Sequence, residues 1–186
     1  MKPSESVTLL ISDDEPIIRN GLASLDWEAH GITLAATARN GLETLRLAEE
    51  HHPVDIFLMD IRMPGLSGLE AAEKLVEKNP QARIIFLSGY GEFEYARRAI
   101  TIRACDYLLK PSTPEEILAC VERARDQVLQ ARERDRGRQK MARDLKNLSV
   151  LVAASQLMEH REESDDERDI VRIVEYISQH YQEPLS

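Results

Sequence analysis

Cysteine is scarce in this chain. Only two of the 186 residues are cysteines, Cys105 and Cys120. Two cysteines cannot form a disulfide framework, and their spacing matches no zinc-binding pattern. A disulfide-stabilised secreted protein is therefore excluded, and we expect a reducing, cytoplasmic location.

Long apolar runs and an excess of basic residues are also absent. No run of 18 apolar residues occurs, and the first ten residues (MKPSESVTLL) contain no signal-peptide core, so we expect neither membrane insertion nor secretion. The 24 basic and 33 acidic residues give a formal net charge of −9. Broad nucleic-acid binding by this chain is not expected, because neutralising phosphates requires clustered Lys and Arg.

Short apolar runs alternate with amphipathic stretches of helical length. The predicted strands are 7–11, 32–37, 54–59, 83–87 and 106–109. The predicted helices between them are 15–28, 41–51, 67–79 and 92–103. Continuous apolar runs indicate strands that are buried on both faces, as in a parallel sheet. The sequence therefore predicts an α/β, doubly wound domain of ordinary size with an appendage.

Polar side chains stand where the predicted strands end. Asp13 and Asp14 follow the first strand, Asp60 the third, Ser88 the fourth and Lys110 the fifth. Ligands of open parallel sheets bind beyond the carboxyl ends of the strands. We therefore expect these side chains to converge on one crevice.

The three carboxylates predict a Mg²⁺ site and a phosphoryl acceptor. Close carboxylates repel one another, and a divalent cation relieves that repulsion. Oxygen ligands with room for water favour Mg²⁺. A carboxylate beside such a cation can attack phosphorus, with Asp60 as the acceptor, Lys110 supplying positive charge and Ser88 a hydroxyl donor.

Each of these residues also has a purely structural explanation. Asp13 and Asp14 could cap a helix that begins at Pro16, and Asp60 could open a turn. Ser88 is an ordinary loop residue beside glycine, and Lys110 could simply end a strand. The combination favours a site, because all of these residues fall at strand ends on one side of one sheet.

Four motifs in the chain resemble the receiver domain of two-component response regulators. They are ISDDEP at 11–16, LMDIRMPGLSG at 58–68, FLSGY at 86–90 and DYLLKP at 106–111. The resemblance covers residues 6–125. It implies a flavodoxin-like domain with a five-stranded parallel sheet in the order 2-1-3-4-5, and phosphorylation of Asp60 by a sensor histidine kinase.

The same resemblance implies a set of metal ligands. Asp14 and Asp60 would bind Mg²⁺ directly, and Asp13 would act mainly through a bound water. The backbone carbonyl of Arg62 would complete the protein ligands.

The resemblance also implies a switch. Ser88 would turn inward to bond a phosphoryl oxygen, and Tyr107 would rotate into the space that Ser88 leaves. Lys110 would pair with the phosphoryl group, and the Lys110–Pro111 bond would be cis. Without the surrounding motif, Tyr107 would be interpreted as a half-buried aromatic residue of a strand.

The chain departs from the family pattern before the DYLLKP motif. Many family members have a glycine a few residues earlier, whereas this chain has TIRAC at 101–105. A backbone with positive φ would be awkward there without glycine. The end of the preceding helix is therefore expected to differ.

A long helix is predicted from Pro114 onward, with Thr113 as its N-cap. Apolar residues recur in heptad spacing, with breaks at Asp135 and Arg138. The members are Ile117, Val121, Ala124, Val128, Ala131, Ala142, Leu145 and Val152. Two interpretations fit: a surface helix folded onto the domain, or a long dimerising coiled coil.

The last residues carry a second resemblance. Residues 169–186 look like the opening helix of an AraC-type helix-turn-helix domain; a simple amphipathic terminal helix is the alternative. We therefore expect a receiver domain at 6–125, a helical linker at 126–168 that could form a coiled coil, and the start of an AraC-type DNA-binding domain at 169–186.

The predicted function is a phosphorylation-dependent response regulator and not an enzyme. Its expected partners are a sensor histidine kinase and a second copy of the chain, with promoter DNA bound only through a C-terminal domain missing from this sequence. The rivals are a phosphohydrolase resembling haloacid dehalogenases, a constitutive dimerisation module and a stand-alone chemotaxis-type receiver. The first is disfavoured because its two carboxylates stand two residues apart after the first strand, whereas Asp13 and Asp14 are adjacent. The third is disfavoured by the long tail.

Overall fold

The structure, a computed structural model, describes residues 6–89 and 93–159, with side chains in the last helix described as far as Val152. The chain divides into two compact units, Met1–Arg132 and Glu133–Ser186. The predicted AraC-type segment at 169–186 lies outside the described residues. The predicted domain boundaries stay predictions.

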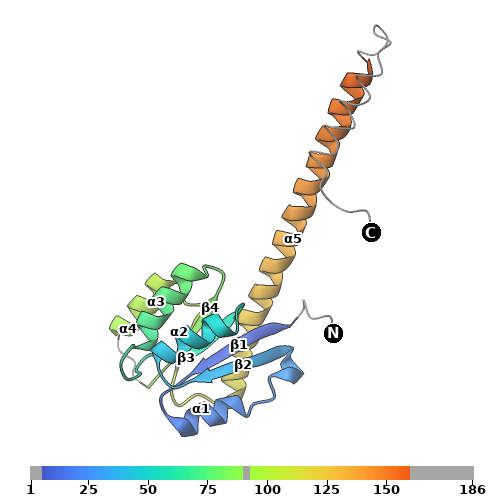
Figure 1. Ribbon diagram of the computed structural model, residues 1–186. Helices are drawn as coiled ribbons and strands as arrows, with labels where there is room; N and C mark the ends of the chain where they lie inside the picture. Colours follow the sequence, from blue (N-terminus) through green and yellow to red (C-terminus); the bar gives the residue numbers. More distant parts are fainter. Residues whose placement is uncertain (1–5, 90–92, 160–186) are drawn as a thin grey trace. The chain divides into compact units, whose positions relative to one another are not determined.

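A five-stranded parallel sheet forms the centre of the first unit (Figure 1). Its strands are β1 (Val7–Ser12), β2 (Ile32–Ala38), β3 (Ile56–Asp60), β4 (Arg83–Ser88) and β5 (Asp106–Leu109). The order is β2-β1-β3-β4-β5, and every neighbouring pair is parallel. This confirms the predicted flavodoxin-like topology.

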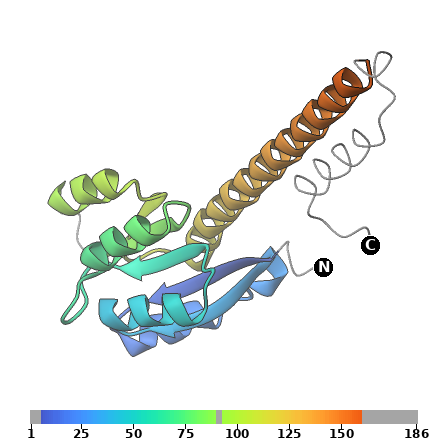
Figure 2. The same ribbon diagram turned by 45° about the horizontal axis from the view of Figure 1, so that its top comes forward.

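Helices follow the strands as predicted. They are α1 (Pro16–Ala23), the short 3₁₀ helix η1 (Glu28–His30), α2 (Gly41–Glu50), α3 (Gly68–Lys78), α4 (Phe93–Ile102) and α5 (Pro114–Glu159). Figure 2 shows α5 as one unbroken helix. Within the part of the chain that the structure describes, no helix is long and apolar enough to cross a membrane.

Two apolar clusters cover the two faces of the sheet. Alternate residues of β1 show the division: Leu9 and Ile11 belong to the cluster that includes α1 and α5, and Leu10 to the cluster that includes α2, α3 and α4. Side chains on successive strand positions point to opposite faces. The sheet is therefore covered on both faces, and the carboxyl ends of its strands remain available for a site.

The predicted helix at 15–28 is wrong beyond Ala23. Helix α1 ends at Ala23, with Ser24 as its C-cap. The chain then turns so that Trp27 is 3% exposed, with its indole N–H donating to the carbonyl of Leu22 at 2.9 Å. Burying the large indole with its donor satisfied stabilises this turn more than continuing the helix would. Asp26 accepts from the backbone of Ala29 and helps to form η1.

The first turns of α5 pack on the domain itself. Ile117, Val121, Ala124 and Val128 are 0–7% exposed within the core cluster. Arg132 donates to Asp55 Oδ1 at 2.7 Å, still within the first unit. The folded-back interpretation is therefore correct up to about residue 132, and this part of the predicted heptad seam is unavailable to a second chain.

Candidate functional site

Three carboxylates meet at the carboxyl ends of β1 and β3. Asp13 and Asp14 follow β1, Asp60 is the last residue of β3, and ligand oxygens of all three lie within 4.8 Å of one another. Asp13 is 0% and Asp60 7% exposed, whereas Asp14 is exposed. The structure therefore brings together the acidic residues that the sequence places at separate strand ends.

Lys110 bridges two of the carboxylates. Its Nζ atom donates to Asp13 Oδ2 at 2.8 Å and to Asp60 Oδ2 at 3.0 Å. Burial, the largest single influence, lowers the pKa of Lys110, but the two carboxylates together outweigh it and hold the pKa above its usual value. Lys110 is therefore a fixed positive charge beside Asp60.

Burial makes Asp13 a poorly hydrated carboxylate. It raises the pKa of Asp13, although the hydrogen bond from Lys110 opposes the shift. Its Oδ1 accepts the backbone N–H of Glu15 at 3.0 Å. Helix α1 has Glu15 as its N-cap and no side-chain cap, so the helix-capping alternative for Asp13 and Asp14 is wrong.

Gly68 allows the start of helix α3 to approach the backbone of Asp60 closely. A Cβ atom on Gly68 would lie 1.9 Å from the carbonyl oxygen of Asp60, and the Gly68 N–H donates to Ile61 O at 2.9 Å. Ser67 and Glu70 form a capping box at the start of α3. Sequence reasoning did not single out Gly68, although the PGLSG string contains it. In the loop after Asp60, the N–H of Arg62 donates to Asp60 Oδ1 at 3.4 Å.

Ser88 and Tyr107 lie on the neighbouring strands. Ser88 ends β4, is 1% exposed and accepts the backbone N–H of Lys110 at its carbonyl oxygen at 2.7 Å. Tyr107 is half-buried on β5, paired in register with Phe86. The Lys110–Pro111 bond is cis, which confirms that expectation.

The missing glycine before DYLLKP has a structural consequence. Arg103 has φ of 60°, the single positive φ among non-glycine residues that the structure describes. The Arg103 N–H donates to Ile100 O and the Ala104 N–H to Ala99 O, each at 2.9 Å. This is the Schellman arrangement that usually ends a helix at glycine. Arg103 therefore keeps the helix end that the family glycine would supply, at a cost in backbone strain.

These residues together make a site suited to a hard cation and an anion. The donor set consists of oxygen atoms, which Mg²⁺ prefers. Three carboxylates against one lysine leave the cluster with two net negative charges when all are ionised. Asp13, Asp14 and Asp60 could hold the cation, and Lys110 could contact an anionic group on Asp60.

Comparison with known proteins decides the family. The family described as "Response regulator receiver domain" matches residues 9–122. The chain belongs to the response regulator receiver family. Among curated relatives it is 39% identical over 115 residues to the transcriptional regulatory protein YesN of Bacillus subtilis, and 38% identical over 124 residues to the nitrate/nitrite response regulator NarL of Escherichia coli. A solved two-component transcriptional regulator AraC from Clostridium phytofermentans is 36% identical with a TM-score of 0.62, covering 67% of this chain and 97% of that one.

The receiver is only part of the longer relatives. The matches cover 61% of this chain and 31% of YesN, and 67% of this chain and 57% of NarL. These relatives are named as regulatory proteins and not as enzymes, in agreement with the expected class.

Proposed function

We propose that this chain is the phosphorylation-controlled part of a transcriptional response regulator. The observation that carries the proposal is the position of Asp60, a carboxylate at a strand end 3.0 Å from a lysine and within 4.8 Å of two further carboxylates. Its 7% exposure leaves a small part of its surface open to solvent.

Phosphoryl transfer would use the Asp60 carboxylate as the nucleophile. An Asp60 oxygen attacks phosphorus of a phosphohistidine on a sensor kinase; the O–P bond forms, the P–N bond breaks and the nitrogen keeps the electron pair. Lys110 neutralises charge on the phosphoryl oxygens, and Ser88 donates its hydroxyl to one of them. Asp13, Asp14, Asp60 and the Arg62 carbonyl would hold Mg²⁺, which would supply the remaining positive charge.

The new charge on Asp60 would then bias the neighbouring strands. Ser88 and Tyr107 lie on adjacent strands and would shift together, which would change the face formed by α4, β5 and α5. We propose that this shift controls homodimerisation and an AraC-type DNA-binding output beyond the receiver. The resemblance of 169–186 and the AraC-named structural relative support that output class.

The proposal is tested with a small phosphodonor, since the kinase is unidentified. Wild type, Asp60→Asn and the control Asp26→Asn are incubated with acetyl phosphate and Mg²⁺, and incorporation is measured by intact mass. We expect one phosphoryl group on wild type and on Asp26→Asn, and none on Asp60→Asn or after Mg²⁺ removal with a chelator. Equal incorporation by Asp60→Asn would refute the assignment.

A further inference from the structure

Large apolar side chains lie exposed along the second part of α5. Met141, Leu145, Leu148 and Val152 are 67%, 62%, 57% and 48% exposed, and we refer to these four residues as the 141–152 stripe. Their steps of four, three and four residues place them on one helix face. Leu151, 65% exposed, lies beside them.

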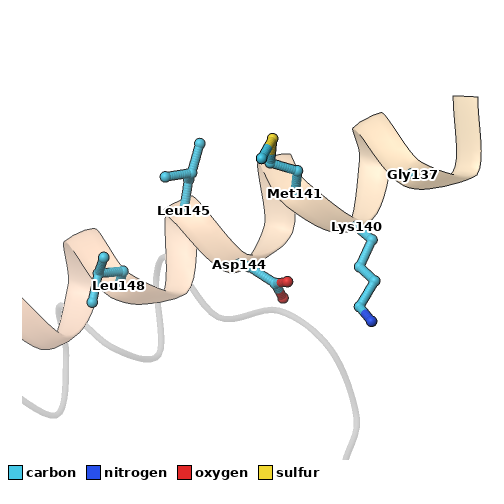
Figure 3. A pocket seen from close by; sticks show the side chains of 6 residues that line it. All are labelled: Gly137, Lys140, Met141, Asp144, Leu145 and Leu148. Carbon is cyan, nitrogen blue, oxygen red and sulfur yellow. The ribbon is translucent and has the colours of Figure 1, made fainter. Parts of the chain in front are cut away.

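The charged side chains of Lys140 and Asp144 border the stripe on one side. Figure 3 shows Met141 and Leu145 on the side of the helix away from Lys140 and Asp144. These residues, with Gly137 and Leu148, line a surface hollow of about 350 Å³.

The exposure differs sharply along the same helix. The core-facing residues Ile117, Val121, Ala124 and Val128 are covered by their own domain at 0–7% exposure, whereas the stripe is not. Contiguous exposed apolar side chains of this kind mark interaction surfaces in soluble proteins.

We propose that the 141–152 stripe pairs with the same stripe of a second copy in a parallel coiled coil. A seam of alternating three- and four-residue steps is self-complementary, because each apolar position meets its counterpart across a two-fold axis. This inference rests on the proposed dimerisation and names the surface responsible for it.

The residues that flank the stripe are compatible with self-pairing. Ala142 and Ser149 are small and uncharged. In a parallel pair, Asp144 of one copy faces the position of Ser149 in the other copy and does not meet a second aspartate. The cations Arg143 and Lys146 fall at outer positions of the heptad. Pairing therefore brings no like charges together along the stripe.

The seam has a defined beginning. One step before Met141 in the same register stands Arg138, where two copies would place like charges opposite each other. Twelve helical residues extend over roughly 18 Å. A standard stable interface buries about 800 Å² per partner, and one face of a helix of this length is too short to bury that area. The stripe should therefore associate weakly by itself and depend on a second contact from phosphorylated receivers.

Sedimentation velocity at increasing protein concentration, with Mg²⁺ and beryllofluoride, tests the inference on the whole chain. Leu145→Glu and Leu148→Glu each place a charge in the stripe. Gln139→Glu adds the same acid, with the same change in charge, on an exposed position outside it. We expect at least a tenfold weaker dimer for the two stripe variants and less than a twofold change for Gln139→Glu.

Two results would overturn the stripe as the dimer contact. One is a wild type that stays monomeric at every concentration, as it would if another segment of its own chain covered the stripe. The other is dimerisation of the stripe variants equal to that of Gln139→Glu. Acetyl phosphate labelling of the same proteins separates the two proposals. Stripe variants that are phosphorylated normally but do not dimerise support the stripe. Absence of labelling in wild type refutes the acceptor role of Asp60, and the comparison of the stripe variants with Gln139→Glu then tests the stripe by itself.

Discussion

Replacing Asp14 by asparagine should stabilise the metal-free protein. Asp14 is exposed, and its carboxylate lies within 4.8 Å of those of Asp13 and Asp60. Two unit charges at 4.8 Å repel by about 0.9 kcal/mol at the dielectric constant of water. Lys110 pairs with Asp13 and Asp60 and so weakens both repulsions. Asp14→Asn should therefore increase the free energy of unfolding by about 1 kcal/mol, less than the two unscreened repulsions together.

Urea denaturation with and without Mg²⁺ measures this effect. A ligand that binds only the folded state stabilises it by about 1.4 kcal/mol when its concentration is tenfold above Kd. Wild type should gain that stability from Mg²⁺, and Asp14→Asn should gain much less because it lacks one carboxylate ligand. The two proteins should therefore change order when Mg²⁺ is added.

Asp26→Asn is the matched control. It removes the same charge from another exposed position, and asparagine keeps the oxygen that accepts from Ala29. We expect a change within ±0.5 kcal/mol and an unaltered response to Mg²⁺. If Asp14→Asn were no more stable than Asp26→Asn without metal, or if both responded equally to Mg²⁺, the electrostatic account of the cluster would be refuted.

Three further predictions concern close backbone packing, a helix end and the buried core. Gly68→Ala should destabilise the protein by about 2–3 kcal/mol, because its Cβ would clash with the backbone of Asp60; Gly21→Ala, which meets nothing within 4 Å, should be neutral or stabilising in the same urea assay. Arg103→Gly should stabilise by about 1 kcal/mol by relieving the positive φ, and a lower thermal midpoint would contradict this. Burial raises the pKa of Cys120 to about 12, so iodoacetamide at pH 8 should leave it unmodified in the native protein and alkylate it only in urea, as read by peptide mass spectrometry. Since the folded state holds this proton more tightly than the unfolded state, its contribution to stability should fall as pH rises above about 9.

The fold was predictable because its strands are buried on both faces. Continuous apolar runs such as 84–87 identify central parallel strands directly, and the polar residues after four of the five runs mark the edge where the candidate site lies. The site followed from the same pattern: Asp13, Asp60 and Lys110 are far apart in the sequence, yet parallel topology brings the ends of their strands together.

Periodicity alone could not identify what covers an apolar face. The heptad steps continue in one phase from Ile117 to Val152, apart from the breaks at Asp135 and Arg138. The first four members are buried against the sheet, whereas Leu145 and Val152 are exposed. The same limit explains the helix predicted at 15–28, where burial of Trp27 determined the chain direction. Close backbone approach, as at Gly68, leaves no periodic signal at all.

The charge imbalance at the site connects its stability to its function. Asp13 is fully buried and keeps Lys110 as its partner, and the same Nζ atom is shared with Asp60. One cation cannot neutralise three carboxylates, so the cluster is held in place by the surrounding fold at an energetic cost, as expected for functional sites. A change that adds positive charge should stabilise the cluster, and a change that adds negative charge to Asp60 should displace Lys110 from the pairing seen here. Because the backbone N–H of Lys110 also bonds the carbonyl of Ser88, a movement of this lysine acts directly on the edge between β4 and β5. In the proposed switch, the unequal charge is therefore what would transmit an event at Asp60 to the neighbouring strands.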